Sequence, residues 1–265
     1  MIRPISNSGS LRALFELQKN QRGLDRTMDR LSSGKKVNSG RDNPAALISG
    51  EQLAAEIAAL EAQSQSYARA SSRVSITDGH AAQVSSMLSE MNALVIASAN
   101  DGGLSDAEKA ANQMQIDSLA QSIQRFAGDA IGSMDSFNMP GGGNAELEAM
   151  MNSVMAAVQS VRSGGANDLS SGNLDSAQKE ITQAISDAAS FRGTLGGYQK
   201  NTLEPAIRSN QVALENLMDA KSRLIDADFG EETANLARYE VLTKAGMKVL
   251  GIINEQSKSV LDLFG

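Results

Sequence analysis

The stretch that decides the fold is VSSMLSEMNALV at residues 84–95, in which apolar side chains recur at intervals of three and four. That interval places them on one face of an α-helix. Working outward, only isolated glycines interrupt the pattern from residue 45 to about residue 98. We therefore predict one helix of roughly 50 residues, which at about 1.5 Å per residue would be roughly 80 Å long. Such a length is typical of an extended bundle or a filament.

The chain before this long helix shows a second helical pattern. Leucine and methionine recur at spacings of three, four or seven between residues 11 and 31, which predicts an amphipathic helix with a coiled-coil-like period. A turn-rich connector at residues 32–40 ends that helix. Asp42-Asn43-Pro44 then supplies a cap and an early proline for the next helix.

The chain after the long helix is also helical in pattern. Ser105 and Glu108 form a capping-box signature that opens another helix. A helical pattern resumes near residue 175, and Pro205 is expected to kink that helix or break it locally. The last helix follows residues 226–230 and carries a broad apolar stripe that needs a partner.

The segment 135–172 carries the weakest pattern. It is rich in glycine, and only residues 145–161 have a spacing that a short helix would fit. Strands are disfavoured because β-branched and aromatic residues are sparse. We predict an all-α fold: an elongated helical bundle in which the chain goes out, turns at a small irregular tip and returns.

Charge indicates how the two ends meet. Residues 1–44 carry a net charge of +5, whereas residues 226–265 carry −3. Exposed ion pairs contribute only about 0.2–1 kcal/mol each, so charge sets pairing and direction while the apolar stripes supply most of the stabilisation. We predict that the N- and C-terminal helices pair as a coiled coil.

Composition excludes several classes of function. The chain has no cysteine and one histidine, so disulfides, thiolate metal sites, a cysteine nucleophile and most imidazole chemistry are absent. A net charge of −7 opposes general affinity for nucleic acid or anionic membrane. No apolar run approaches the roughly 20 residues of a membrane span. The first ten residues lack a signal-peptide pattern, so we expect the protein either to stay inside the cell or to leave by a route that cleaves no signal.

Two sets of motifs resemble bacterial flagellin, the subunit of the flagellar filament. Near the N-terminus they are RLSSGKKVNS at residues 30–39 and RDNPAA at residues 41–46. Near the C-terminus they are SRLIDADF at 222–229, ETANL at 232–236 and SVLDLFG at 259–265. The resemblance covers roughly residues 1–130 and 173–265.

The resemblance implies a division of the chain into three parts. Residues 1–44 and 226–265 would form a terminal coiled-coil domain in an inner tube. Residues 45–134 and 173–225 would form a long helical bundle domain in an outer tube, and residues 135–172 would be a short variable tip or insert. The large outer domains of longer flagellins would be missing.

The resemblance also implies a function. The chain would be a structural subunit, not an enzyme, that self-assembles into a helical filament for motility, with its terminal helices ordering on polymerisation. It would be secreted to the extracellular flagellum. Its partners would be other copies of itself, an export chaperone at the C-terminal helix, the type III export apparatus, and hook-associated and cap proteins, with no cofactor, nucleic acid or membrane.

Two rival functions remain open. One is a hook–filament junction protein of the same organelle, which shares the terminal architecture. The other is an enzyme embedded in the variable segment, but residues 135–172 contain no histidine for a zinc hydrolase. Asp226 and Asp228 could be a carboxylate pair for metal or acid–base work, yet without a third ligand nearby we favour helix caps and filament contacts.

The predicted assembly interface combines the apolar stripes of the two ends with the polar residues of the motifs. We predict no catalytic, cofactor-binding or metal-binding residue. The interface residues are Leu14, Leu17, Leu24, Met28, Leu31, Ser33, Asn38, Asp42, Asp226, Asp228, Phe229, Leu236, Leu242, Val249, Ile253, Val260 and Leu263.

Overall fold

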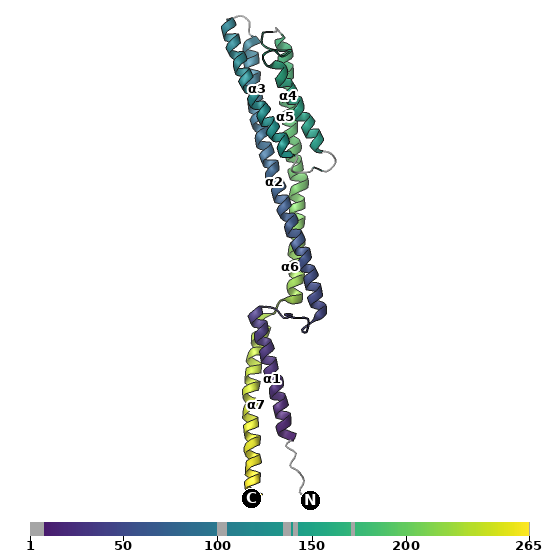
Figure 1. The fold of residues 1–265 in the computed structure, drawn as a ribbon, viewed down its shortest axis with the longest axis vertical. Coiled ribbons are helices and arrows are strands. Elements are labelled where there is room, and N and C mark those ends of the chain that lie inside the picture. Colours follow the sequence, from purple (N-terminus) through teal and green to yellow (C-terminus); the bar gives the residue numbers. More distant parts are fainter. Residues whose placement is uncertain (1–7, 100–104, 135–138, 140–142, 171–172, 265) are drawn as a thin grey trace. The chain divides into compact units, whose positions relative to one another are not determined.

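The computed structural model describes residues 8–99, 105–134, 139, 143–170 and 173–264 (Figure 1). Every regular element in these ranges is a helix, which confirms the all-α prediction. In chain order the elements are α1 (Ser8–Ser33), α2 (Pro44–Ala99), α3 (Asp106–Met134), α4 (Gly143–Val161), α5 (Leu174–Tyr198), the π-helical turn η2 (Gln199–Leu203), α6 (Glu204–Ile225) and α7 (Phe229–Phe264).

The chain divides into two compact units. Unit 1 consists of residues 1–59 and 214–265, and unit 2 consists of residues 60–213. This division falls inside α2 and α6, whereas the predicted domain limits near residues 44 and 225 coincide with helix ends. The assignment of the predicted domains to inner and outer tubes concerns the filament and stays a prediction.

Unit 2 is a bundle in which the apolar stripe at residues 84–95 forms part of the core. Val84, Leu88, Met91 and Val95 of α2 are fully buried, as their spacing predicts. Small side chains line much of the rest, and Phe191 of α5 is the largest fully buried residue. The core is therefore built with few aromatics because alanine, valine and methionine let the helices pack closely.

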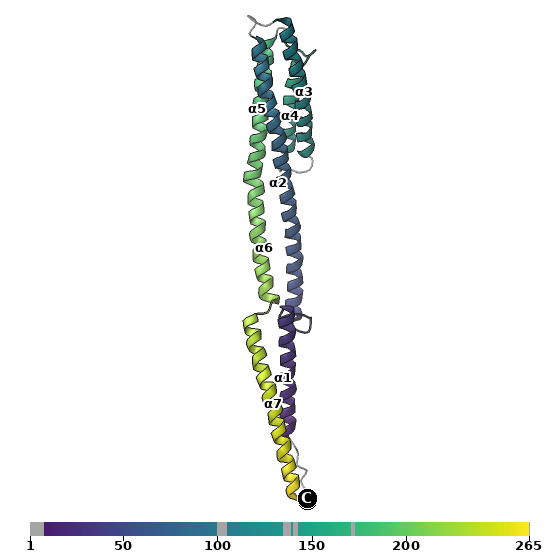
Figure 2. The ribbon, with the colours of Figure 1, turned by 90° about the vertical axis from the view of Figure 1, so that its left-hand side faces the viewer.

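The middle segment contains the short helix that the spacing of residues 145–161 fits. This helix is α4, which packs along α3 and α5 (Figures 1 and 2). Leu147, Met151, Val154 and Val158 of α4 are fully buried. Their spacing of four, three and four residues gives α4 one apolar face, so this segment contributes to the core of unit 2.

Two local predictions hold in unit 2. Ser105 and Glu108 form the predicted capping box, since the Ser105 N–H donates to Glu108 Oε2 at 2.7 Å and the Glu108 N–H donates to Ser105 Oγ at 3.3 Å. The predicted local break before Pro205 is η2, where the Glu204 N–H donates to the Gln199 carbonyl five residues back. Proline cannot donate to this ladder, and a wider turn before it relieves its steric conflict. The sequence NDGG at residues 100–103 predicts a turn before this capping box, but the turn lies outside the described residues.

Unit 1 contains α1 and α7, which lie side by side in both views (Figures 1 and 2). Their directions are opposite, because contacts join Arg30 to Glu232 near one end and Leu17 to Gly246 further along. The predicted pairing of the two terminal helices is thus present within a single chain.

Candidate assembly site

The seam between α1 and α7 is made by small and polar residues. A Cβ on Gly23 would lie 2.5 Å from Tyr239 Cε1, so only glycine lets the tyrosine ring pack here. A Cβ on Gly246 would lie 3.3 Å from Leu17 Cδ1. Thr27 and Thr243 are also buried. The two helices approach closely, but the seam uses little of the large apolar surface that they carry.

Most of the large apolar side chains on α1 and α7 face outward. We call this set the outward apolar face, and each member is at least 38% exposed: Leu11, Leu14, Phe15, Met28, Phe229, Val241, Leu242, Met247, Val249 and Ile252.

The predicted interface residues are therefore divided between the two surfaces. Those that are half-buried are Leu17, Leu24, Leu31, Leu236 and Ile253. Those that belong to the outward apolar face are Leu14, Met28, Phe229, Leu242 and Val249. The side chains of Val260 and Leu263 lie outside the described residues.

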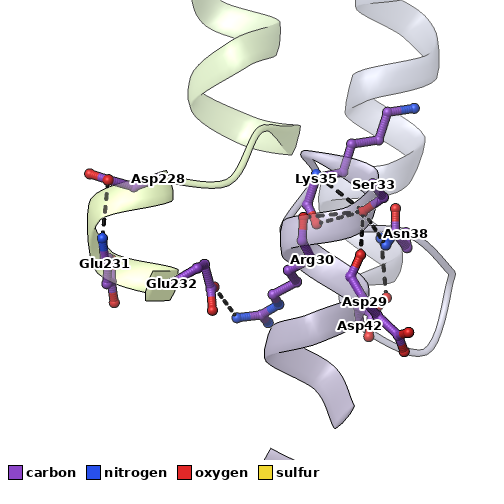
Figure 3. Close-up of polar contacts among 9 residues, drawn as sticks. All are labelled: Asp29, Arg30, Ser33, Lys35, Asn38, Asp42, Asp228, Glu231 and Glu232. Carbon is purple, nitrogen blue, oxygen red and sulfur yellow. Dashed lines mark hydrogen bonds and ion pairs between the residues drawn. The ribbon is translucent and has the colours of Figure 1, made fainter. Parts of the chain in front are cut away.

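The loop between α1 and α2 is held by Ser33 and the turn that follows it. Gly34 has φ of +70°, a conformation that favours glycine, and its N–H donates to the Arg30 carbonyl at 2.8 Å to end α1. Ser33 Oγ donates to the Asp29 carbonyl at 2.8 Å and accepts from Asn38 Nδ2 at 2.6 Å (Figure 3). The motif residues thus fold the chain back on the end of α1.

Asp42 closes the same loop. Its Oδ2 accepts hydrogen bonds from the Ser39 hydroxyl at 3.0 Å, the Ser39 N–H at 3.0 Å and the Asn38 N–H at 3.1 Å. These donors, the Ser39 hydroxyl first, lower the pKa of Asp42 because they stabilise its charged form. Asn43 then caps α2 by accepting from the Ala46 N–H at 3.0 Å.

The turn between α6 and α7 is joined to this loop by backbone hydrogen bonds. The Lys36 N–H donates to the Ile225 carbonyl at 2.8 Å, and the Ala227 N–H donates to the Gly34 carbonyl at 2.9 Å. Asp228 caps α7, since its Oδ1 accepts from the Gly230 N–H at 2.8 Å and the Glu231 N–H at 3.2 Å. The structure therefore brings the two sets of motif residues together in unit 1.

A partly buried ion pair joins α1 to α7. Arg30 Nη1 donates to Glu232 Oε1 at 2.9 Å, and the Glu232 side chain is only 7% exposed (Figure 3). Glu232 Oε2 has no hydrogen-bond partner among the described residues. The sequence analysis does not find this pair, because 202 residues separate its members and the spacing within each helix does not define the register between them.

A polar cleft opens beside this pair. It has a volume of about 780 Å³, and we call it the basic cleft because three arginines reach it. Arg26 and Arg41 were not predicted as site residues, although the excess of basic residues before position 45 was a signal for them. The lining residues are Arg26, Asp29, Arg30, Ser32, Ser33, Asn38, Ser39, Arg41 and Asp42.

We expect the loop to loosen in acid. Because the pKa of Asp42 is lowered on folding, its contribution to stability is complete above about pH 4 and is lost as the pH falls through that lowered pKa. A ¹³C NMR titration of the Asp42 carboxyl should give a midpoint below that of an unperturbed aspartate. In the Ser39→Ala control the midpoint should rise, and an unchanged midpoint there would contradict the assigned cause.

The Arg30–Glu232 pair should fix the register of α1 against α7. Glu232→Ala leaves Arg30 without its partner and is expected to cost about 1.5–3 kcal/mol. Hydrogen exchange of seam amides should accelerate about tenfold or more. Glu232→Gln, which keeps the shape and an acceptor for Arg30, should show a smaller change. Equal exchange rates in Glu232→Ala and the parent protein would contradict this role.

Two kinds of site are absent from the part of the chain that the structure describes. No group of three or more histidine, cysteine, aspartate or glutamate side chains is placed to hold a metal ion there. Within the same residues, no helix combines the length and apolar character needed to cross a membrane.

Comparison with known proteins identifies both ends of the chain. A family model described as the bacterial flagellin N-terminal helical region matches residues 6–134, and one described as the bacterial flagellin C-terminal helical region matches residues 178–264.

Curated relatives match over most of their length. A flagellin of Halalkalibacterium halodurans is 26% identical over 90% of each chain. A flagellar filament 33 kDa core protein of Treponema phagedenis is 26% identical over 91% of this chain and 92% of its own. A flagellin of Bacillus subtilis is 25% identical over 97% of this chain and 98% of its own.

Proposed function

Because this chain belongs to the bacterial flagellin family and is a structural subunit of the flagellar filament, we propose that it polymerises through the outward apolar face. The observation that carries this proposal is the exposure of ten large apolar side chains on α1 and α7. Exposed apolar side chains in this number favour a protein–protein contact, since burying each such side chain contributes about 1.5–3 kcal/mol.

Polymerisation would then further stabilise the ordered, helical state of the two terminal helices. Both helices are formed over their described ranges, but the close seam covers only one side of each. Neighbouring subunits would cover the other side and so stabilise the helical state by mass action. We propose that residues 1–44 and 226–265 form the inner tube of the filament, and that residues 45–134 and 173–225 form the outer tube.

The predicted interface residues have different roles in this proposal. Leu14, Met28, Leu242 and Val249 would contact neighbouring subunits directly. Ser33, Asn38 and Asp42 would act by shaping the loop, and Asp228 by starting α7. Val260 and Leu263 remain proposed from the sequence.

Partners beyond other copies of the chain are also part of the proposal. A dedicated export chaperone would bind the apolar face of α7 before export, as an amphipathic helix lies in a groove. The type III export apparatus would pass the chain to the cell exterior, and the absence of cysteine suits a chain threaded unfolded. Hook-associated and cap proteins would contact the filament ends.

A purely structural role is supported over catalysis. The family is one of structural proteins, and the polar contacts described above serve caps, turns and helix pairing. We propose that the chain is not an enzyme. The hook–filament junction protein is less favoured, because curated relatives over most of the chain are named flagellins and filament core proteins.

Negative-stain electron microscopy of the purified protein under polymerising conditions tests this function. We expect long helical filaments that grow from the single protein. A protein that stays monomeric at every concentration, or that forms only short caps on added filament ends, would contradict the subunit role and favour the junction protein.

A further inference from the structure

Unit 1 carries two surfaces of opposite charge. Residues 26–42, which contain the arginines of the basic cleft, have five basic and two acidic side chains. Residues 226–232 have four acidic side chains and no basic one. We call residues 226–231 the acidic turn.

Some of these charged side chains form ion pairs or hydrogen bonds within the subunit, and others do not. Arg30 pairs with Glu232, and Lys36 Nζ donates to the Arg223 carbonyl. The guanidinium groups of Arg26 and Arg41, by contrast, have no hydrogen bond or ion pair with any described residue. Two carboxylates also line the basic cleft. Asp29 is unpaired within the described chain, and Asp42 already accepts hydrogen bonds from Asn38 and Ser39.

The acidic turn has a matching excess of unpaired negative charge. The carboxylates of Asp226 and Glu231 are exposed and make no ion pair within the described chain. Asp228 is occupied in capping α7. Beside them Phe229 is 57% exposed, although a phenylalanine at a helix start would ordinarily be covered. The turn therefore presents two unpaired carboxylates and an exposed aromatic ring.

Among the described residues, the charged side chains of these two surfaces do not pair with one another within one subunit. Figure 3 shows Asp228 and Glu231 on one side of α1 and α7, and Asn38 and Asp42 of the cleft on the other side. Both belong to unit 1, so their separation is a property of that unit. A contact between two different faces of identical subunits is heterologous, and where its rotation does not close it generates an open helical polymer.

We propose that the acidic turn of one subunit docks into the basic cleft of the next. This inference rests on the proposed function and names one contact by which the polymer is built. Asp226 and Glu231 would face Arg26 and Arg41, and the exposed ring of Phe229 would lie against a guanidinium group, because the face of an aromatic ring attracts cations. Complementary charge also sets register, because a mismatched neighbour places like charges together.

Charge reversal and charge exchange test the proposal. Arg41→Glu reverses one charge of the basic cleft, and Glu231→Lys reverses one charge of the acidic turn. Each substitution alone should raise the critical concentration for polymerisation at least about tenfold. The two substitutions together exchange the charges one for one and should restore the critical concentration to near that of the parent protein.

The outcomes separate this inference from the proposed function. If the parent protein forms filaments and both reversed variants polymerise equally well, the docking contact is wrong while the subunit role stands. If the combined variant is no better than either reversed one, the two surfaces do not face each other. If the parent protein forms no filament, the proposed function itself fails. Circular dichroism of each monomer checks that the fold is intact.

A second measurement reports the contact directly. Because the chain has no cysteine, single cysteines can be introduced without interference. Subunits with Arg41→Cys, carrying a mass tag, are mixed with subunits with Glu231→Cys, polymerised and oxidised. We expect disulfide-linked dimers that contain one subunit of each kind. Filaments that contain both variants but give only like-with-like dimers, or no dimers, would overturn the proposal.

Discussion

Filaments are expected to be lost when Val241, Val249 and Ile252 are all replaced by serine, while the monomer stays folded. The three side chains are between 47% and 65% exposed in the single chain. Since each residue advances roughly 100° around an α-helix, they fall on one side of α7. Exposed positions of this kind usually change monomer stability by less than about 0.5 kcal/mol.

The effect on polymerisation should be much larger than the effect on folding. If neighbouring subunits bury these side chains, the triple serine variant loses roughly 3 kcal/mol or more per subunit, which raises the critical concentration about a hundredfold. Sedimentation across a concentration series measures this change, and circular dichroism measures the fold.

A matched control changes the same three positions but keeps them apolar. The variant Val241→Ile, Val249→Ile and Ile252→Val retains an apolar side of α7 and should polymerise like the parent protein. Normal filaments from the serine variant would show that this side of α7 faces solvent in the polymer, and the proposed role of the outward apolar face would then be wrong.

Helical periodicity made the elements of this fold predictable. The three- and four-residue spacing around Leu88 gives one buried face for α2, and capping and proline signals locate helix starts at Asn43 and Ser105. Pro205 predicts a local break because a residue without an N–H cannot continue the ladder, and the π-helical turn before it is the form that the break takes.

The surfaces of the candidate site were less predictable. An apolar stripe shows that a helix has a partner, but not which of its side chains the first partner covers. The α1–α7 seam is built around Gly23, Thr27 and Gly246, which contribute nothing to a hydrophobic pattern. Leucines that look equivalent in sequence are therefore divided, with Leu17 packed near the seam and Leu14 left outside.

Tertiary contacts explain two further differences. The spacing of residues 145–161 fits α4 itself, but it does not show that the apolar face of α4 completes the core of unit 2. The Arg30–Glu232 pair depends on the antiparallel register of α1 and α7, which backbone bonds between Lys36 and Ile225 and between Ala227 and Gly34 help to define. Neither the packing of α4 nor the Arg30–Glu232 pair can be read from the spacing of residues within one helix.

Deleting residues 236–265 is expected to abolish polymerisation while unit 2 stays folded. The deletion removes most of α7, and with it the partner of α1 at Gly23 and Leu17. It also removes the apolar side chains Val241, Val249 and Ile252 that we assign to subunit contacts. Both the seam and the neighbouring contact are therefore lost in one change.

Unit 2 should be insensitive to this deletion. The buried residues of its core run from Val74 to Leu203, and the deleted segment contributes none of them. We expect the thermal transition of unit 2 to stay within a few degrees of that in the full chain. As a reference for what core damage does, Phe191→Ala should cost about 3–5 kcal/mol and lower that transition clearly.

Sedimentation and circular dichroism of the truncated protein distinguish the possible results. Absence of polymer at concentrations where the full chain forms filaments, together with an unchanged transition of unit 2, supports assembly through the terminal helices. Normal filaments from the truncated chain would mean that contacts of residues 60–213 suffice to build the polymer. A collapse of the unit 2 transition would instead mean that α7 stabilises the bundle, and the independence of the two units would be wrong.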